Sequence, residues 1–191
     1  MARASIFEVL EYLRSLEARG IKAVHAYAIR DRFGLSTGSL KVLLWRASKK
    51  GFINRIGKRW IALPHVQPYE ILPLIYPPSY TSMEWALHYH GISMQKPFTV
   101  TAVSTRKTKT INSNIWSIEI HHVKDSLFFG FDPNYVAHPE KALLDLAYVR
   151  GKIDVELDLS EIDRKVLKAY LAKYPSFVEK ILRNYIRESK H

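Results

Sequence analysis

Cysteine is absent from this sequence of 191 residues, which excludes disulfide bonds and thiolate metal sites. No run of 18 or more apolar residues is present, so we expect no membrane-spanning helix. Residues 1–20 alternate apolar and charged side chains and lack the unbroken apolar stretch of a secretory signal peptide. We therefore expect a cytoplasmic protein.

The common catalytic motifs are also missing: HExxH, a Gly-rich phosphate loop, Gly-x-Ser-x-Gly and a cysteine nucleophile. The histidines of the C-terminal part have spacings that match no metal site: His88, His90, His121, His122 and His138. Glu119 and Asp132 with Glu140-Lys141 resemble a nuclease site only weakly. We predict that the chain is not an enzyme and binds no metal or cofactor, with a nuclease as the less favoured alternative.

What the sequence does have is positive charge, and most of it lies in one third of the chain. The net charge is +11. Residues 1–64 hold 13 Lys and Arg against four acids, a net of +9, whereas residues 65–191 hold 16 against 14, a net of +2. A local positive field attracts polyanions. The distribution favours a nucleic-acid partner over the alternative of a generally basic protein.

Proline marks a boundary between two domains. Five of the nine prolines fall within one short stretch: Pro64, Pro68, Pro73, Pro77 and Pro78. Proline lacks a backbone donor and restricts the residue before it, so we expect no long regular element there, only a short turn at residues 69–72. The sequence predicts a first domain over residues 1–64, a Pro-rich linker over 65–79 and a second domain over 80–191.

The first domain has the pattern of a winged helix-turn-helix. Hydrophobic period, caps and turns predict three helices and then two strands, over residues 3–19, 26–33, 37–50, 52–56 and 59–63. Ser36 is the expected N-cap of the third helix, and Gly57-Lys58 is the turn of the hairpin. In that fold the third helix enters the major groove of DNA while the hairpin, or wing, meets the backbone.

The third helix should turn Leu40, Leu43, Leu44 and Ala47 inward and leave its opposite face for DNA. Hydroxyls and free N–H groups in its first turn can hold a phosphate, and its cations can reach phosphates or guanine edges. The predicted DNA-binding residues are Ser36, Thr37, Ser39, Lys41, Val42, Trp45, Arg46, Lys49, Arg55, Lys58 and Arg59. Arg106, Lys107 and Lys109 are candidates for a second basic contact, with nucleic acid or with an acidic partner, and a plain solvated turn is the alternative for this segment. The alternative is a basic face that binds protein, and Trp45 in particular favours packing against another domain or subunit.

The remaining two thirds mix strands with helices. Alternation predicts strands over residues 98–103 and 116–122 and a third, short one over 127–131. Helices are expected over residues 81–90, opened by a Thr81–Glu84 capping box, and over 139–150, with two amphipathic tail helices separated by Pro175. The fold class is α+β: an N-terminal winged helix-turn-helix, then a small β-sheet with helices that ends in a helical hairpin.

Two segments of the second domain resemble the AbiEi-type antitoxins. Residues 80–91, with Tyr80-Thr81-Ser82, Ala86-Leu87 and His90-Gly91, are similar to the helix that opens that family's second domain. Pro-Glu-Lys-Ala-Leu-Leu-Asp-Leu at residues 139–146 is similar to its strongest motif. The layout, a winged helix followed by this domain, is also the family's, so the resemblance covers nearly the whole chain.

The resemblance implies a DNA-binding transcriptional repressor that is the autoregulating antitoxin of a type IV toxin–antitoxin pair. It implies a nucleotidyltransferase-like toxin as partner and inverted repeats in double-stranded DNA as the operator. A homodimer would match the two-fold symmetry of such an operator. A stand-alone transcriptional regulator or a protein-interaction module without a toxin remains the alternative. Glu140, Lys141 and Asp145 of the motif have no role that the sequence reveals.

Overall fold

The computed structural model describes residues 4–188, which form two compact units. The first unit contains the chain up to residue 75 together with residues 111–117, and the second contains residues 76–110 and those from 118 onward. Each unit combines helices with a small sheet, as the predicted α+β class requires. Within residues 4–188, no helix combines the length and the apolar character that crossing a bilayer requires.

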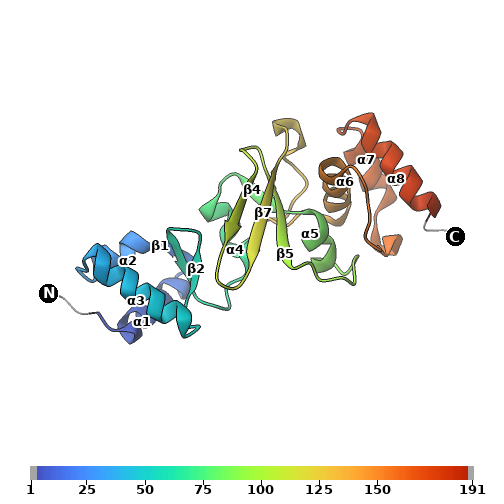
Figure 1. Ribbon diagram of the computed structural model, residues 1–191. Coiled ribbons are helices and arrows are strands. Elements are labelled where there is room, and N and C mark those ends of the chain that lie inside the picture. Colours follow the sequence, from blue (N-terminus) through green and yellow to red (C-terminus); the bar gives the residue numbers. More distant parts are fainter. Residues whose placement is uncertain (1–3, 189–191) are drawn as a thin grey trace. The chain divides into compact units, whose positions relative to one another are not determined.

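The first unit contains three helices, a three-stranded sheet and a fourth helix (Figure 1). In chain order they are α1 (Ile6–Glu17), β1 (Ala23–His25), α2 (Ala26–Arg32), α3 (Thr37–Lys49), β2 (Asn54–Ile56), β3 (Trp60–Ala62) and α4 (Pro68–Ile75). The strand order is β1-β3-β2, with both pairs antiparallel. The three helices followed by a hairpin agree with the prediction. Strand β1 was not predicted, because three residues are too few to show an alternating pattern.

Local signals in the sequence set the ends of the first helices. Ser5 and Glu8 form a capping box at the start of α1, in which each side chain accepts the other residue's backbone N–H. Inward side chains of α1, α2 and α3 then meet in one core: Leu10, Leu13, Ile29, Leu40, Leu44 and Ala47. Burying a Leu or Ile side chain stabilises a fold by about 1.5–3 kcal/mol. This core therefore decides which face of α3 remains in solvent.

Helix α4 occupies part of the stretch predicted as a linker, so that prediction is wrong for residues 68–75. Pro68 is tolerated in the first turn, where its missing N–H has no helical partner to lose. Pro73 lies inside the helix, yet Ile71 and Leu72 are both fully buried. Burial of these two side chains outweighs the backbone hydrogen bond that Pro73 cannot make.

Truncating the buried face of α4 should therefore destabilise the first unit. We expect Ile71→Ala to lower the free energy of unfolding by about 2–5 kcal/mol, because it leaves a cavity in the core. The matched control is Leu74→Ala on the same helix: Leu74 is 47% exposed, and its loss should cost less than about 1 kcal/mol. Urea unfolding followed by tryptophan fluorescence measures both. Similar small losses for the two variants would contradict the burial of α4.

The second unit contains most of a four-stranded sheet in the order β4-β5-β7-β6, while residues 111–117, which include the end of β6 and the start of β7, belong to the first. The helices of the second unit lie beyond this sheet, one after another (Figure 1). Its elements are β4 (Ser79–Thr81), α5 (Met83–Tyr89), β5 (Thr99–Ser104), β6 (Lys109–Asn112), β7 (Ser117–His122), the 3-10 turns η1 (Asp125–Leu127) and η2 (Leu159–Glu161), α6 (Pro139–Arg150), α7 (Arg164–Leu171) and α8 (Ser176–Glu188). Helix α5 packs on β5 and α6, and α6 packs on α7 and α8. The helix over residues 139–150 and the two tail helices on either side of Pro175 agree with the prediction, and both tail helices pack on α6.

The start of α5 differs from the prediction. Thr81 does not cap it but lies in β4, and Ser82 occupies the N-cap position without a side-chain cap bond. The hydroxyl of Thr101 in β5 replaces the cap: it accepts the N–H of Trp85 at 3.1 Å and donates to the carbonyl of Ser82 at 2.7 Å. The predicted capping box is wrong because a partner distant in sequence satisfies this helix end.

Two further predictions for the second unit are wrong. Residues 127–131 form no strand, and Phe131 makes only an isolated bridge with Ala137. The apolar side chains there belong to an aromatic cluster, since Phe128 and Phe131 both pack against the ring of Tyr80. Phe98 was expected to begin a strand, but β5 begins one residue later, at Thr99, and the Phe98 side chain is fully exposed.

Candidate nucleic-acid interface

Helix α3 is the centre of the candidate interface, and a local cap sets its start. The hydroxyl of Ser36 accepts the N–H of Ser39 at 3.1 Å, as expected of the N-cap. Leu40, Leu44 and Ala47 are buried, and Leu43 is half-buried. The inward stripe thus agrees with the prediction and turns the opposite face of α3 outward.

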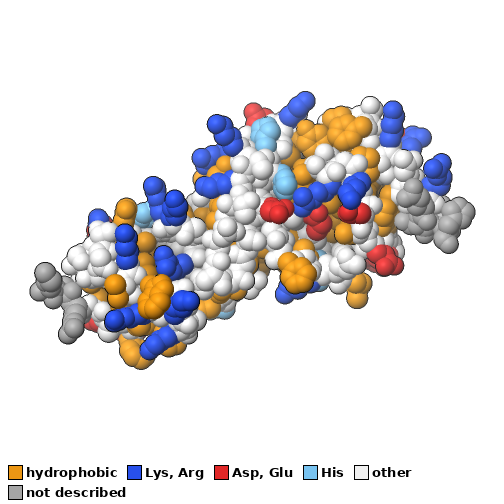
Figure 2. Space-filling model, viewed as in Figure 1, with side chains coloured by type: hydrophobic (Ala, Val, Ile, Leu, Met, Phe, Trp, Pro, Cys, Tyr) orange, Lys and Arg blue, Asp and Glu red, His pale blue; other side chains and the backbone are white. Residues whose placement is uncertain are grey.

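That outward face is exposed and mixes cations with large apolar side chains. Its members are Gly38, Lys41, Val42, Trp45, Arg46 and Lys49, all exposed. Val42 is 49% and Trp45 is 54% exposed. Figure 2 shows Lys and Arg side chains gathered with hydrophobic ones over this part of the first unit. This face therefore leaves two large apolar side chains in solvent beside its cations.

The first turn of α3 borders a shallow groove. The groove has a volume of about 620 Å³ and is lined from α3 by Gly38, Ser39, Val42 and Arg46 and from the start of α1 by Ser5. The hydroxyls of Ser36 and Ser39 lie 2.9 Å apart and bind each other, so Ser36 is engaged in capping. Thr37 is exposed, and Gly38 has no side chain to keep a ligand from the backbone. These features leave room for a phosphate at this helix end.

The hairpin of β2 and β3, which is the predicted wing, is only partly exposed to solvent. Lys58 and Arg59 lie in the turn between β2 and β3 and are exposed, as predicted. The outer edge of β2, however, is covered by the segment 111–117. Gly57 N–H donates to the carbonyl of Asn112 at 2.7 Å, and Arg55 N–H donates to Oδ1 of Asn114 at 2.6 Å. Arg55 is half-buried, so Lys58 and Arg59 are the better candidates for a backbone contact.

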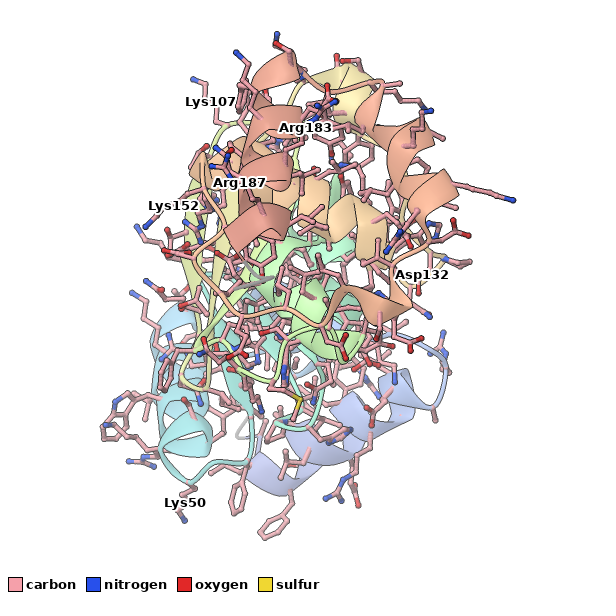
Figure 3. The ribbon with its side chains drawn as sticks, turned by 90° about the vertical axis from the view of Figure 1, so that its right-hand side faces the viewer. Lys50, Lys107, Asp132, Lys152, Arg183 and Arg187 are labelled. Atoms are coloured by element: carbon pink, nitrogen blue, oxygen red, sulfur yellow. The ribbon has the colours of Figure 1, made fainter. Side chains whose placement is uncertain are left out.

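No acidic side chain neutralises this region. The sequence has no Asp or Glu between Asp31 and Glu70. In the part of the chain that the structure describes, none of its cations forms an ion pair: Lys41, Arg46, Lys49, Lys50, Arg55, Lys58 and Arg59. Lys50 was not predicted, although it follows Lys49 at the end of α3, and its side chain points away from the fold (Figure 3). The positive field here is therefore uncompensated.

Helix α2 adds two side chains that the sequence reasoning missed. Tyr27 is 50% exposed, and the guanidinium of Arg30 lies over its ring at 4.7 Å. Arg30 also forms an ion pair with Asp31 at 2.8 Å, so the carboxylate offsets the positive charge of this guanidinium. In a helix-turn-helix the first helix of the motif crosses the DNA backbone. The sequence signal for these residues is a short helix with two cations in its last turn, Arg30 and Arg32.

The predicted second basic contact belongs to the second unit. Arg106, Lys107 and Lys109 lie at the connection from β5 to β6 and are exposed. The structure gathers these three around Tyr76, also of the second unit. They form a separate cationic group from the one on α3.

A buried ionic cluster lies at the centre of the second unit. Lys141 and Asp145 have no exposed side-chain surface, and Nζ of Lys141 donates to Oδ1 of Asp145. Asp145 also accepts the hydroxyls of Tyr174 at 2.7 Å, Ser82 at 2.7 Å and Tyr80 at 3.1 Å. Burial lowers the pKa of the Lys141 ammonium, and Asp145 acts against this shift. Burial together with the charge of Asp145 raises the pKa of the Tyr174 hydroxyl.

The cluster explains the polar residues of the 139–146 motif as parts of the fold. Glu140 accepts the backbone N–H of Asp163, the N-cap of α7, at 2.8 Å. The pair of Lys141 and Asp145 binds Tyr174, which lies between α7 and α8. These contacts anchor the C-terminal hairpin on α6. Since the two charged side chains are enclosed, their arrangement indicates structure rather than chemistry on a ligand.

The acids that resemble a nuclease site and the histidines that could bind a metal do not form a common ligand cluster in the described residues. Glu119 pairs with Arg150 at 3.3 Å, and Oδ1 of Asp132 accepts the N–H of Val136 at 2.9 Å. Within residues 4–188, no three His, Asp or Glu side chains come together as metal ligands would. Glu119 and Asp132, like Glu140, therefore serve contacts within the second unit.

No protein-family model matches the chain, and a search of curated proteins finds no match.

Proposed function

We propose that the first unit is a winged helix-turn-helix that binds duplex DNA and that the protein represses transcription in the cytoplasm. Helix α3 enters the major groove, with Lys41, Arg46 and Lys49 on phosphates and base edges. The groove at its first turn receives a phosphate. The wing, through Lys58 and Arg59, lies on the backbone.

One observation carries this proposal: an exposed helix face with cations, Val42 and Trp45 in a region without any acid. A face used only for solubility has cations and acids interspersed. A face used for protein contact also has apolar side chains, but seven unpaired cations without a carboxylate fit a polyanion better. Hydrophobic contact by Val42 suits a thymine methyl group.

The further functions implied by the AbiEi-type resemblance stay predictions. These are autoregulation as an antitoxin, a nucleotidyltransferase-like toxin partner and a homodimer on an inverted repeat. The buried cluster of Lys141 and Asp145 accounts for the motif residues without a toxin, so a stand-alone regulator is the second candidate.

Selection of bound fragments from random duplex DNA, using the full chain, tests the proposal. We expect enrichment of a defined site, with an inverted repeat if the protein binds as a dimer. Measured on that site, log affinity should fall with log salt by a slope of about −0.9 per phosphate contact. No enriched sequence together with a slope near zero would overturn DNA binding and favour the protein-interaction alternative.

A further inference from the structure

The connection from β5 to β6, residues 105–108, is held rigidly against its own sheet. It crosses β7, because β7 lies between β5 and β6 in the strand order. His122, the last residue of β7, donates its N–H to the Thr108 hydroxyl at 3.1 Å, and its Nδ1 lies 3.1 Å from the carbonyl oxygen of Arg106. The N–H of Arg106 donates to the Ser104 hydroxyl at 3.0 Å.

Tyr76 completes a depression beside this connection. Its side chain is 7% exposed, and its hydroxyl donates to the carbonyl of Lys107 at 2.7 Å. The depression has a volume of about 480 Å³ and is lined by Tyr76, Thr105, Arg106, Lys107 and His122. All five belong to the second unit, so this hollow is built within one compact part of the protein.

Arg106 is preoriented in the depression. Its guanidinium lies 4.5 Å from the centre of the Tyr76 ring and donates one hydrogen bond to the carbonyl of Pro77 at 3.1 Å. A guanidinium has five N–H donors, so four remain for a ligand. A side chain that is already ordered loses less entropy when it binds.

The charged side chains that line or border the depression from the β5–β6 connection are all cations. Lys107 is part of its lining, and the ammonium of Lys109 lies 5.2 Å from the Tyr76 ring centre. The sequence has no Asp or Glu between Glu84 and Glu119. Because a carbonyl oxygen only accepts, Nδ1 of His122 is the donor in its contact with Arg106. Figure 2 shows Lys and Arg side chains grouped at one end of this sheet, and Lys107 projects outward in Figure 3.

We propose that this depression is a phosphate-binding site, filled by the phosphate of a nucleotide or of a nucleic-acid backbone. Arg106 binds two phosphate oxygens through its planar donors, as arginine does at phosphate sites. Lys107 and Lys109 neutralise the remaining charge. The proposal does not depend on DNA binding by α3, because the depression lies in the other unit.

Titration of the full chain with inorganic pyrophosphate, at constant ionic strength and without DNA, tests the site. We expect saturable shifts of the His122 ring signals in NMR spectra. Arg106→Gln/Lys107→Gln should weaken binding at least about tenfold, since one charge-assisted contact is worth about that factor. Lys96→Gln, an exposed lysine of the same unit outside the depression, is the matched control and should bind like the wild type.

Two further binding experiments identify the molecule that carries the phosphate. Binding of ADP about tenfold tighter than pyrophosphate would assign the site to a nucleotide. Displacement of pyrophosphate by duplex DNA, but not by AMP, would assign it to a nucleic-acid backbone. Shifts that do not saturate, or equal losses in the double variant and in Lys96→Gln, would show general attraction of anions and overturn the site.

Discussion

Lys41→Ala and Arg46→Ala should each weaken binding to the selected DNA site by about 1–3 kcal/mol if the side chain contacts a base. Both cations lie on the exposed face of α3, without an ion-pair partner in the described part of the chain. Their loss therefore removes contacts to DNA without breaking one within the protein. Fluorescence anisotropy with a labelled duplex measures the affinities.

The salt dependence of DNA binding distinguishes a cation that contacts a base from one that contacts only phosphate. A cation that touches only phosphate should weaken binding to all sequences alike, and its loss should reduce the salt slope by about 1. Arg19→Ala is the matched control, because Arg19 is an exposed cation of the first unit that follows α1. Losses of equal size for Arg19, Lys41 and Arg46 would mean that net charge alone drives binding. Unchanged affinity for both α3 variants would show that α3 does not read the DNA.

Breaking the buried pair of Lys141 and Asp145 should cost more than any surface change. We expect Lys141→Met or Asp145→Asn to lower the free energy of unfolding by about 3–5 kcal/mol, because each leaves one uncompensated charge in the core. The oxygen that asparagine keeps can still accept the hydroxyls of Tyr80 and Ser82, which share Oδ2, while its amide group replaces the Oδ1 that Tyr174 and Lys141 bind. Urea unfolding of the full chain measures the loss.

The double variant Lys141→Met/Asp145→Asn is the decisive comparison. With both charges removed, it should regain about 1–4 kcal/mol relative to either single variant. If the single variants do not fold, folding of the double variant is itself the expected rescue. A double variant that loses the sum of the two single effects would mean that the two side chains do not act as a pair.

Local signals in the sequence were enough to predict α3 and its exposed face. Ser36, the stripe of Leu40, Leu44 and Ala47, and Gly51 all lie within one helix length, and each agrees with the others. The same holds for α6, where Pro139 begins the helix and Gly151 ends it in the left-handed conformation. Elements built from contacts between near neighbours are therefore the ones that sequence reasoning recovers.

Contacts between distant residues were not predictable in the same way. Asn114 lies 59 residues from Arg55, yet it binds the edge of the wing. Thr101 replaces the expected cap of α5, and Ile71 and Leu72 hold a helix where prolines suggested a linker. In each case a partner supplied by the fold outweighs the local preference of the chain.

The sequence by itself determined where the cations gather and which helix carries them, because charge and helical period are properties of consecutive residues. Only the tertiary structure decided that Lys141 and Asp145 are enclosed, since a Lys and an Asp four positions apart look like an ordinary surface pair. It also decided that Arg106 and Lys107 border a hollow beside Tyr76, because the strand order carries their connection across β7. Burial and enclosure arise from packing, and packing depends on which distant elements meet.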